Sequence, residues 1–261
     1  MKRLLILVSA GALLLAACGG SDDGLGGGGS PAEEAELTVS GAASLTDAFT
    51  DMGAAFEADN PGVTVTFNFG PSDGLATQIN EGAPVDVFAS ASGTWMDAVQ
   101  DDGPGVTGRT DFAKNRLVII VPSGNPAGIE DISDLAEDDV KLVIAAEGVP
   151  VGDYAREILD EAGITDAALA NVVSNEEDVK AVVTKVVSGE ADAGIVYVTD
   201  VTPDVAGDVE TIEIPDDINV IATYPIAVVT GSQEAALAQR FVDYVLGAGQ
   251  QTLADHGFLP A

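Results

Sequence analysis

Two serines stand where an expected strand gives way to an expected helix. Ser44 follows the alternating stretch 36–40, Ser72 follows the alternating stretch 62–69, and an apolar pattern with helical spacing comes after each serine. The start of a helix leaves backbone N–H groups without intrahelical partners and carries the positive end of the helix dipole. Each serine therefore stands beside donors that can hold an anion.

Two further helices are expected to open near Val151 and Val179. Several helix starts that converge on one point would form an oxyanion site without any Lys or Arg. Ordinary helix capping is the alternative for each serine taken singly. Ser44 followed three residues later by Asp47 also fits a capping box.

The elements that must position these residues alternate between the two kinds of secondary structure. This alternation predicts an α/β fold in which mostly parallel sheets are flanked by helices, and in such folds the carboxyl ends of the strands line a crevice. Two long apolar strands, 116–122 and 224–229, suggest two lobes joined by two crossings, lobe 1 at 37–118 with 223–261 and lobe 2 at 119–222. The remaining expected strands are 86–90, 141–146, 193–197 and 209–214, and the expected helices are 44–56, 75–79, 94–100, 151–162, 176–188 and 233–246.

An ordered series of short motifs resembles the molybdate-binding proteins of bacterial ABC importers. The resemblance covers about residues 37–261. It rests on Gly41–Thr46, Ser72–Ala76, Gly82–Ala91, Val149–Ala155, Glu177–Val179, Gly194–Tyr197 and Tyr224–Val229. It implies a type II periplasmic-binding-protein fold that closes on one tetrahedral oxyanion, molybdate or tungstate. It also implies a monomeric protein that is not an enzyme, needs no cofactor or metal, and delivers its ion to an ABC permease.

The same resemblance assigns the ligands of the ion. Ser44 and Ser72 would donate through hydroxyl and backbone N–H, Val151 and Val179 through backbone N–H, and Tyr197 through its hydroxyl. Trp95, Tyr154 and Tyr224 are expected to be packing residues instead.

Asp73, which directly follows Ser72, does not fit a site made only of hydrogen-bond donors. If its carboxylate faced the crevice, it would repel a dianion and could accept a proton from a protonated oxyanion, which would favour phosphate. If it faced away, it would be a capping residue in a first helical turn. A sulfate- or phosphate-binding protein of the same fold therefore remains an alternative.

The first residues have the features of an export signal. Met1-Lys2-Arg3 is basic, the stretch 4–17 is apolar or small, and Leu15-Ala16-Ala17-Cys18 resembles a bacterial lipobox. Residues 1–17 are therefore expected to be a lipoprotein signal peptide, and Cys18 is expected to carry the lipid that anchors an extracytoplasmic protein to the cell membrane. The Gly- and Ser-rich stretch 18–36 would be a flexible tether.

The charge of the chain argues against one class of partner, and one motif supports an alternative to a binding protein. With 43 Asp and Glu against 10 Lys and Arg, the net charge is −33, which argues against nucleic acid as a partner. That alternative is a serine hydrolase, because Gly70–Gly74 matches G-x-S-x-G around Ser72. Its base would be His256, the single histidine, and its acid Asp243 or Glu234.

Overall fold

The computed structural model describes residues 34–261. The predicted signal peptide, Cys18 and nearly all of the predicted tether lie outside the described residues. Within 34–261, none of the helices has both the length and the apolar character needed to cross a bilayer.

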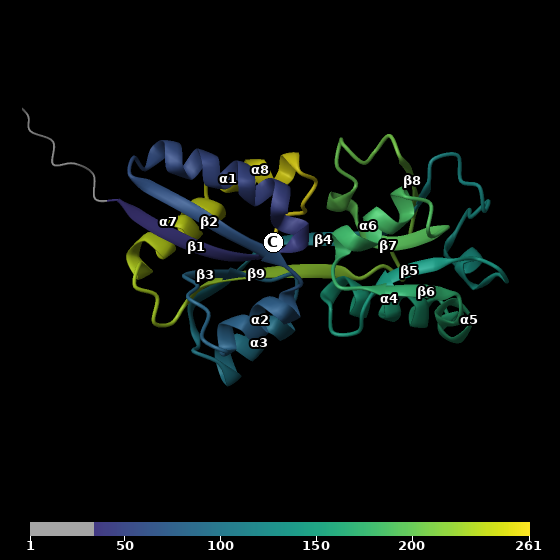
Figure 1. Ribbon diagram of the computed structural model, residues 1–261, viewed down its shortest axis with the longest axis horizontal. Helices are drawn as coiled ribbons and strands as arrows, with labels where there is room; N and C mark the ends of the chain where they lie inside the picture. The colour runs from purple at the N-terminus through teal and green to yellow at the C-terminus, as the bar shows by residue number, and fades with distance from the viewer. Residues whose placement is uncertain (1–33) are drawn as a thin grey trace, which may run out of the picture. The chain divides into compact units, whose positions relative to one another are not determined.

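Nine strands form two sheets that share one long strand (Figure 1). The first sheet has the order β2 (Val63–Gly70), β1 (Ala35–Ala42), β3 (Val87–Ala89), β9 (Ile221–Val229) and the first part of β4 (Val106–Pro122). The second sheet contains the rest of β4, β7 (Ala193–Tyr197), β5 (Leu142–Ala145) and β6 (Val172–Glu176), with β8 (Val209–Glu213) also paired to β4. In each sheet three neighbouring strands are parallel, β2-β1-β3 and β7-β5-β6, and β4 and β9 contribute antiparallel pairs.

Strand β4 passes from one sheet to the other. Its residues 106–116 pair with β9, and its residues 117–122 pair with β7 and β8. The chain returns between β8 and β9, where the Asn219 side chain donates to the Leu117 carbonyl at 2.9 Å and accepts from the Leu117 N–H at 3.2 Å. The two crossings are therefore tied together at Leu117.

Helices cover both faces of each sheet (Figure 1). On the first sheet, α1 (Thr46–Asp59), α7 (Ala235–Leu246) and α8 (Gly249–Asp255) contact one another on one side, and α2 (Ser72–Asn80) and α3 (Gly93–Asp102) pack together on the other. On the second sheet, α6 (Val179–Val187) lies on one side, and α4 (Pro150–Glu161) and α5 (Thr165–Ala170) lie on the other. Three short 3₁₀ helices complete the described part of the chain: η1 (Ala43–Leu45), η2 (Ile132–Ala136) and η3 (Val198–Asp200). The α/β fold class is as predicted.

Three differences from the expected elements have physical reasons. β4 starts ten residues before its apolar run at 116–122, because the polar stretch before that run pairs along β9 with two breaks in register. The helix expected from residue 176 begins at Val179, because Glu176 is the last residue of the edge strand β6. The six-residue α5 and the seven-residue α8 are too short to give a clear helical pattern.

Candidate functional site

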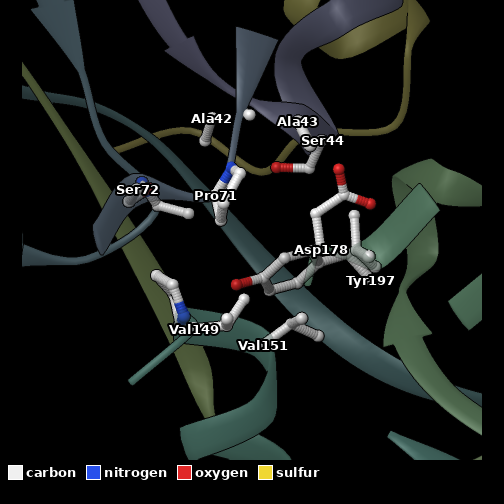
Figure 2. Close-up of a pocket in the computed structure, with 13 residues that line it drawn as sticks. Ala42, Ala43, Ser44, Pro71, Ser72, Val149, Val151, Asp178 and Tyr197 are labelled. Carbon is white, nitrogen blue, oxygen red and sulfur yellow. Dashed lines mark hydrogen bonds between the residues drawn. The ribbon is translucent and has the colours of Figure 1, made fainter. Parts of the chain in front are cut away.

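A small pocket lies where the carboxyl ends of the parallel strands of both sheets meet (Figure 2). Its volume is about 20 Å³, and a single water needs roughly 10–15 Å³. The pocket therefore suits one compact ion. Its lining residues lie at or shortly after the ends of β1, β2, β3, β5, β6 and β7: Ala42, Ala43, Ser44, Gly70, Pro71, Ser72, Ala91, Val149, Pro150, Val151, Asp178, Val179 and Tyr197.

All five residues that the sequence assigned to ligand binding line this pocket. Ser44 and Ser72 lie in η1 and α2 beside the first sheet, and Val151, Val179 and Tyr197 lie in α4, α6 and β7 of the second. All five are buried. The structure thus brings them together, while their roles as ligands remain predictions.

Neither serine caps the helix that follows it. Ser44 lies in η1, the N-cap of α1 is Leu45, and no side chain caps α1. The Ser44 Oγ instead lies 2.9 Å from the Tyr224 hydroxyl. The capping box proposed for Ser44 and Asp47 is therefore wrong, because the 3₁₀ turn displaces Ser44 from the N-cap position.

Ser72 shows the same departure from capping. It is the first residue of α2, whose N-cap is Pro71, and no side chain caps this helix either. The Ser72 Oγ accepts a hydrogen bond from the Ala91 N–H at 3.1 Å. Both hydroxyls are thus held by groups from other parts of the chain rather than by their own helices.

The second sheet presents two helix starts to the pocket. α4 begins at Pro150 with Val149 as N-cap and no side-chain cap, so the Val151 N–H lies in a first turn that offers no intrahelical partner. A Cβ at Gly152 would lie 2.3 Å from the Ala146 carbonyl oxygen, so this helix start packs directly on the end of β5. α6 begins at Val179, and its N-cap Asp178 accepts from the Ala181 N–H at 2.9 Å.

The hydroxyl of Tyr197 is an unpaired buried donor. Tyr197 is 2% exposed, and its OH has no hydrogen-bond partner among the described residues. Figure 2 shows this hydroxyl directed into the pocket. Burial raises the pKa of Tyr197, so the phenol keeps its proton and remains a donor. A buried polar group without a partner destabilises the protein unless a ligand satisfies it.

Among the described residues that line the pocket there is no Lys, Arg or His, and Asp178 is the one acidic residue. Asp73 is not among the lining residues. A carboxylate of Asp73 facing the ion would have favoured phosphate, and the pocket does not have one at that position. The sequence interpretation missed Asp178 because the expected helix began at residue 176; an Asp directly before an apolar helical pattern is the N-cap signal that could have identified it. The attraction for an anion must therefore come from N–H and O–H dipoles.

Three contacts join the two sheets' helices and loops around the pocket. The Trp95 indole N–H of α3 donates to the Gly148 carbonyl at 2.8 Å, and the Tyr154 hydroxyl of α4 donates to the Ala91 carbonyl at 3.3 Å. The Lys180 ammonium of α6 lies 3.1 Å from Asp47 Oδ2 of α1. Trp95, Tyr154 and Tyr224, expected only to pack, thus also use their polar atoms at the site.

The serine-hydrolase interpretation is wrong. His256 Nε2 lies 2.9 Å from Asp51 Oδ2 on α1, and no histidine lines the pocket that contains Ser72. Asp243 accepts from Gln239 on its own helix. Among residues 34–261, no group of three or more His, Cys, Asp or Glu side chains could hold a metal ion.

Comparisons with known proteins agree with this geometry. Residues 37–259 match the family model described as bacterial extracellular solute-binding protein. The chain is 42% identical to molybdate-binding protein ModA of Mycobacterium tuberculosis over 223 residues, covering 85% of this chain and 84% of that protein. It is 31% identical to the putative ABC transporter substrate-binding lipoprotein YvgL of Bacillus subtilis, covering 82% of each.

The solved structure of the periplasmic molybdate-binding protein of Azotobacter vinelandii has the same fold. Its TM-score is 0.76 at 21% identity, over 86% of this chain and 99% of that one. The relatives are binding proteins of transport systems rather than enzymes, as predicted. From the family match and the two relatives above 30% identity, the chain belongs to the bacterial extracellular solute-binding proteins.

Proposed function

We propose that the protein captures molybdate, and also tungstate, in the pocket between its two sheets and delivers it to an ABC permease. The observation that carries the proposal is the Tyr197 hydroxyl, which is buried, unpaired and directed into a pocket the size of one small ion. The names of the curated relatives point to the same ligand.

Five residues are proposed as the ligands of the ion: Ser44, Ser72, Val151, Val179 and Tyr197. The serines offer a hydroxyl and a backbone N–H each, the valines a backbone N–H each, and Tyr197 its hydroxyl. A hydrogen bond to a charged group contributes about 1.5–3 kcal/mol net. About seven such bonds, less the desolvation of the ion and the closure of the pocket, leave about −8 to −12 kcal/mol, a micromolar to nanomolar affinity.

Neutral donors also favour an ion without a proton. Molybdate and tungstate carry none at neutral pH, and neither does sulfate, so size must separate sulfate from the other two. Hydrogen phosphate brings a proton that needs an acceptor. Asp178 Oδ1 accepts from the N–H of Ala181, but a carboxylate can accept further hydrogen bonds. Phosphate is therefore the alternative that depends on Asp178.

Calorimetric titration of the purified full-length chain in detergent, with molybdate, tungstate, sulfate and phosphate, tests the ligand. Molybdate and tungstate should bind with micromolar or tighter affinity, and sulfate at least about tenfold more weakly. Sulfate that binds as tightly as molybdate would contradict the molybdate assignment and support the sulfate alternative.

The proposal places the protein outside the cytoplasm, as a monomer, held to the membrane by a lipid on Cys18 after removal of residues 1–17. The lipobox and the curated lipoprotein relative support this placement. Fractionation of cells should find the wild type in membranes and a Cys18→Ser variant released from them, and mass spectrometry should find the lipid on Cys18. A Cys18→Ser variant that stays in the membrane fraction would contradict the anchor.

A further inference from the structure

The hydroxyl of Ser72 keeps its proton free for the pocket. Its oxygen accepts a hydrogen bond from the backbone N–H of Ala91 at 3.1 Å, and a backbone N–H can never accept. The proton of Ser72 therefore does not point toward Ala91. Ser72 is 1% exposed, and among the described residues its hydroxyl makes no second hydrogen bond. Its proton remains for a ligand.

Ser44 contacts Tyr224, and Tyr224 in turn contacts Asn115, on the side away from the pocket. The Ser44 Oγ lies 2.9 Å from the hydroxyl of Tyr224, a bond in which either atom can donate. The orientation of the Asn115 amide favours Tyr224 as the donor. Its Oδ1 accepts from the Arg116 N–H at 3.0 Å, so Nδ2 is the atom that faces Thr199 Oγ1 at 2.8 Å and the Tyr224 oxygen at 3.5 Å.

An amide nitrogen can only donate, so Asn115, at 3.5 Å, cannot accept the Tyr224 proton, and Ser44 at 2.9 Å is the nearer acceptor for it. Ser44 then receives a hydrogen bond and keeps its own proton for the pocket. Burial raises the pKa of Tyr224, so this proton is not lost at neutral pH.

The ring of Tyr224 is fixed on several sides. It packs edge to face against Phe258, Tyr197 and Phe112, at centroid distances of 5.5, 5.9 and 6.3 Å. Tyr224 is fully buried. Its hydroxyl therefore stays at one position beside Ser44.

We propose that Tyr224, supported by Asn115, is a positioning residue that fixes the Ser44 hydroxyl as a donor to the bound oxyanion, as the Ala91 N–H does for Ser72. The inference rests on the proposed oxyanion site and adds two residues that do not line it. The bonds run in one direction, from Asn115 through Tyr224 and Ser44 to the ion, so each one polarises the next.

The test is a set of double-mutant cycles on the full-length chain in detergent, with molybdate affinity measured by calorimetry. Tyr224→Phe keeps the ring and removes the hydroxyl, and it should weaken binding about tenfold. In a Ser44→Ala background the same change should have less than about a twofold effect, because its target is gone. In a Ser72→Ala background the full tenfold effect should remain.

Matched controls separate positioning from packing. Tyr244→Phe removes a tyrosine hydroxyl on α7, away from the pocket, and should leave the affinity unchanged. Equal losses from Tyr224→Phe in the Ser44→Ala and Ser72→Ala backgrounds would overturn the proposal, as would a loss below twofold in the wild type. If Tyr224→Phe does not fold, Asn115→Leu decides by the same cycles, with the same background dependence expected.

Failure of the positioning role is distinguishable from failure of the molybdate assignment. If the wild type prefers sulfate or phosphate, the molybdate assignment is wrong, and the cycles are run with the preferred ion. If the wild type binds none of the four oxyanions, both proposals are overturned. If it binds molybdate and the two backgrounds do not differ, only the positioning role is overturned.

Discussion

The ammonium of Lys180 lies 3.1 Å from the carboxylate of Asp47. Lys180 is the second residue of α6 and Asp47 the second of α1, so the ion pair joins helices that begin on opposite sides of the pocket. Lys180 also lies 3.4 Å from the fully buried carboxylate of Asp200. Burial lowers the pKa of Lys180, but the two carboxylates outweigh it and raise the pKa overall, so the lysine stays charged.

Removal of the Asp47 charge should make ion release faster without unfolding the protein. Asp47 is half exposed, and an ion pair of that kind contributes about 0.2–1 kcal/mol. We therefore expect Asp47→Asn to speed dissociation of the ion by up to about fivefold in stopped-flow measurements. Asp51→Asn is the matched control, because Asp51 lies on the same helix but pairs with His256 away from the pocket. Equal acceleration by both variants would contradict a role for the Lys180–Asp47 pair in closure.

The buried carboxylate of Asp200 should make stability depend on pH in a defined direction. Burial raises its pKa from 3.8 to about 6, although Lys180 acts in the opposite sense. Between these values the folded protein holds a proton that the unfolded chain has released. The contribution of Asp200 to the free energy of unfolding therefore falls as pH rises from about 4 to about 6, and it is constant above that interval.

The measurement is the difference in melting temperature between wild type and Asp200→Asn. This difference should fall between about pH 4 and 6, because the asparagine has no proton to exchange. Asp204→Asn, at an exposed position, shows the effect of removing one surface charge. A difference that rises with pH would mean that the Lys180 pairing dominates over burial.

Sequence patterns predicted those features of the site that depend only on residues adjacent along the chain. The strand-to-helix turns that contain Ser44, Ser72, Val151 and Val179 could be predicted from periodicity, and the family resemblance added Tyr197. The Ser44–Tyr224 bond joins residues 180 positions apart, and no local pattern reports such a contact. Asp178 was missed for a different reason, because the expected helix began at residue 176 and so placed Asp178 inside the helix instead of at its N-cap.

The contacts of Trp95, the single tryptophan, should make closure visible by fluorescence. Its indole N–H bonds to the Gly148 carbonyl on the other side of the pocket. If the ion draws the two sides together, its addition should change the intensity or wavelength of tryptophan emission, with a midpoint equal to the calorimetric one. Trp95→Phe should bind about two- to tenfold more weakly, the effect of one lost hydrogen bond. Calorimetric binding with unchanged emission would show that this contact does not respond to the ion.

Tyr197→Phe should change binding and stability in opposite directions. The Tyr197 hydroxyl has no partner when the ion is absent. Its removal should therefore raise the free energy of unfolding of the ion-free protein, by at most about 1–3 kcal/mol. The same change should weaken molybdate by about 1–3 kcal/mol, because a bond to a charged ligand is lost. Melting curves without ion, together with calorimetry, measure both effects. An unchanged affinity would show that Tyr197 is not a ligand.

Asp178 offers the sharpest test of what the pocket is built to hold. Asp178 lines the pocket and its carboxylate caps α6, and asparagine is an equally good N-cap. Asp178→Asn should therefore preserve α6 while removing a negative charge beside the ion. Two unit charges about 4 Å apart repel by about 1 kcal/mol even in bulk water. We therefore expect Asp178→Asn to bind molybdate at least about fivefold more tightly than the wild type does. Asp73→Asn, one residue outside the lining, is the matched control and should change the affinity less than twofold.

The opposite result for Asp178 would identify a different ligand class. A protonated oxyanion needs an acceptor, and the Asp178 carboxylate is the one acceptor of that kind among the lining residues. If the wild type bound phosphate tightly and Asp178→Asn abolished that binding while Asp73→Asn did not, the carboxylate would be a ligand for the proton of the ion. Titration of both variants with molybdate and phosphate thus decides between a pocket that tolerates a capping carboxylate and one that uses it.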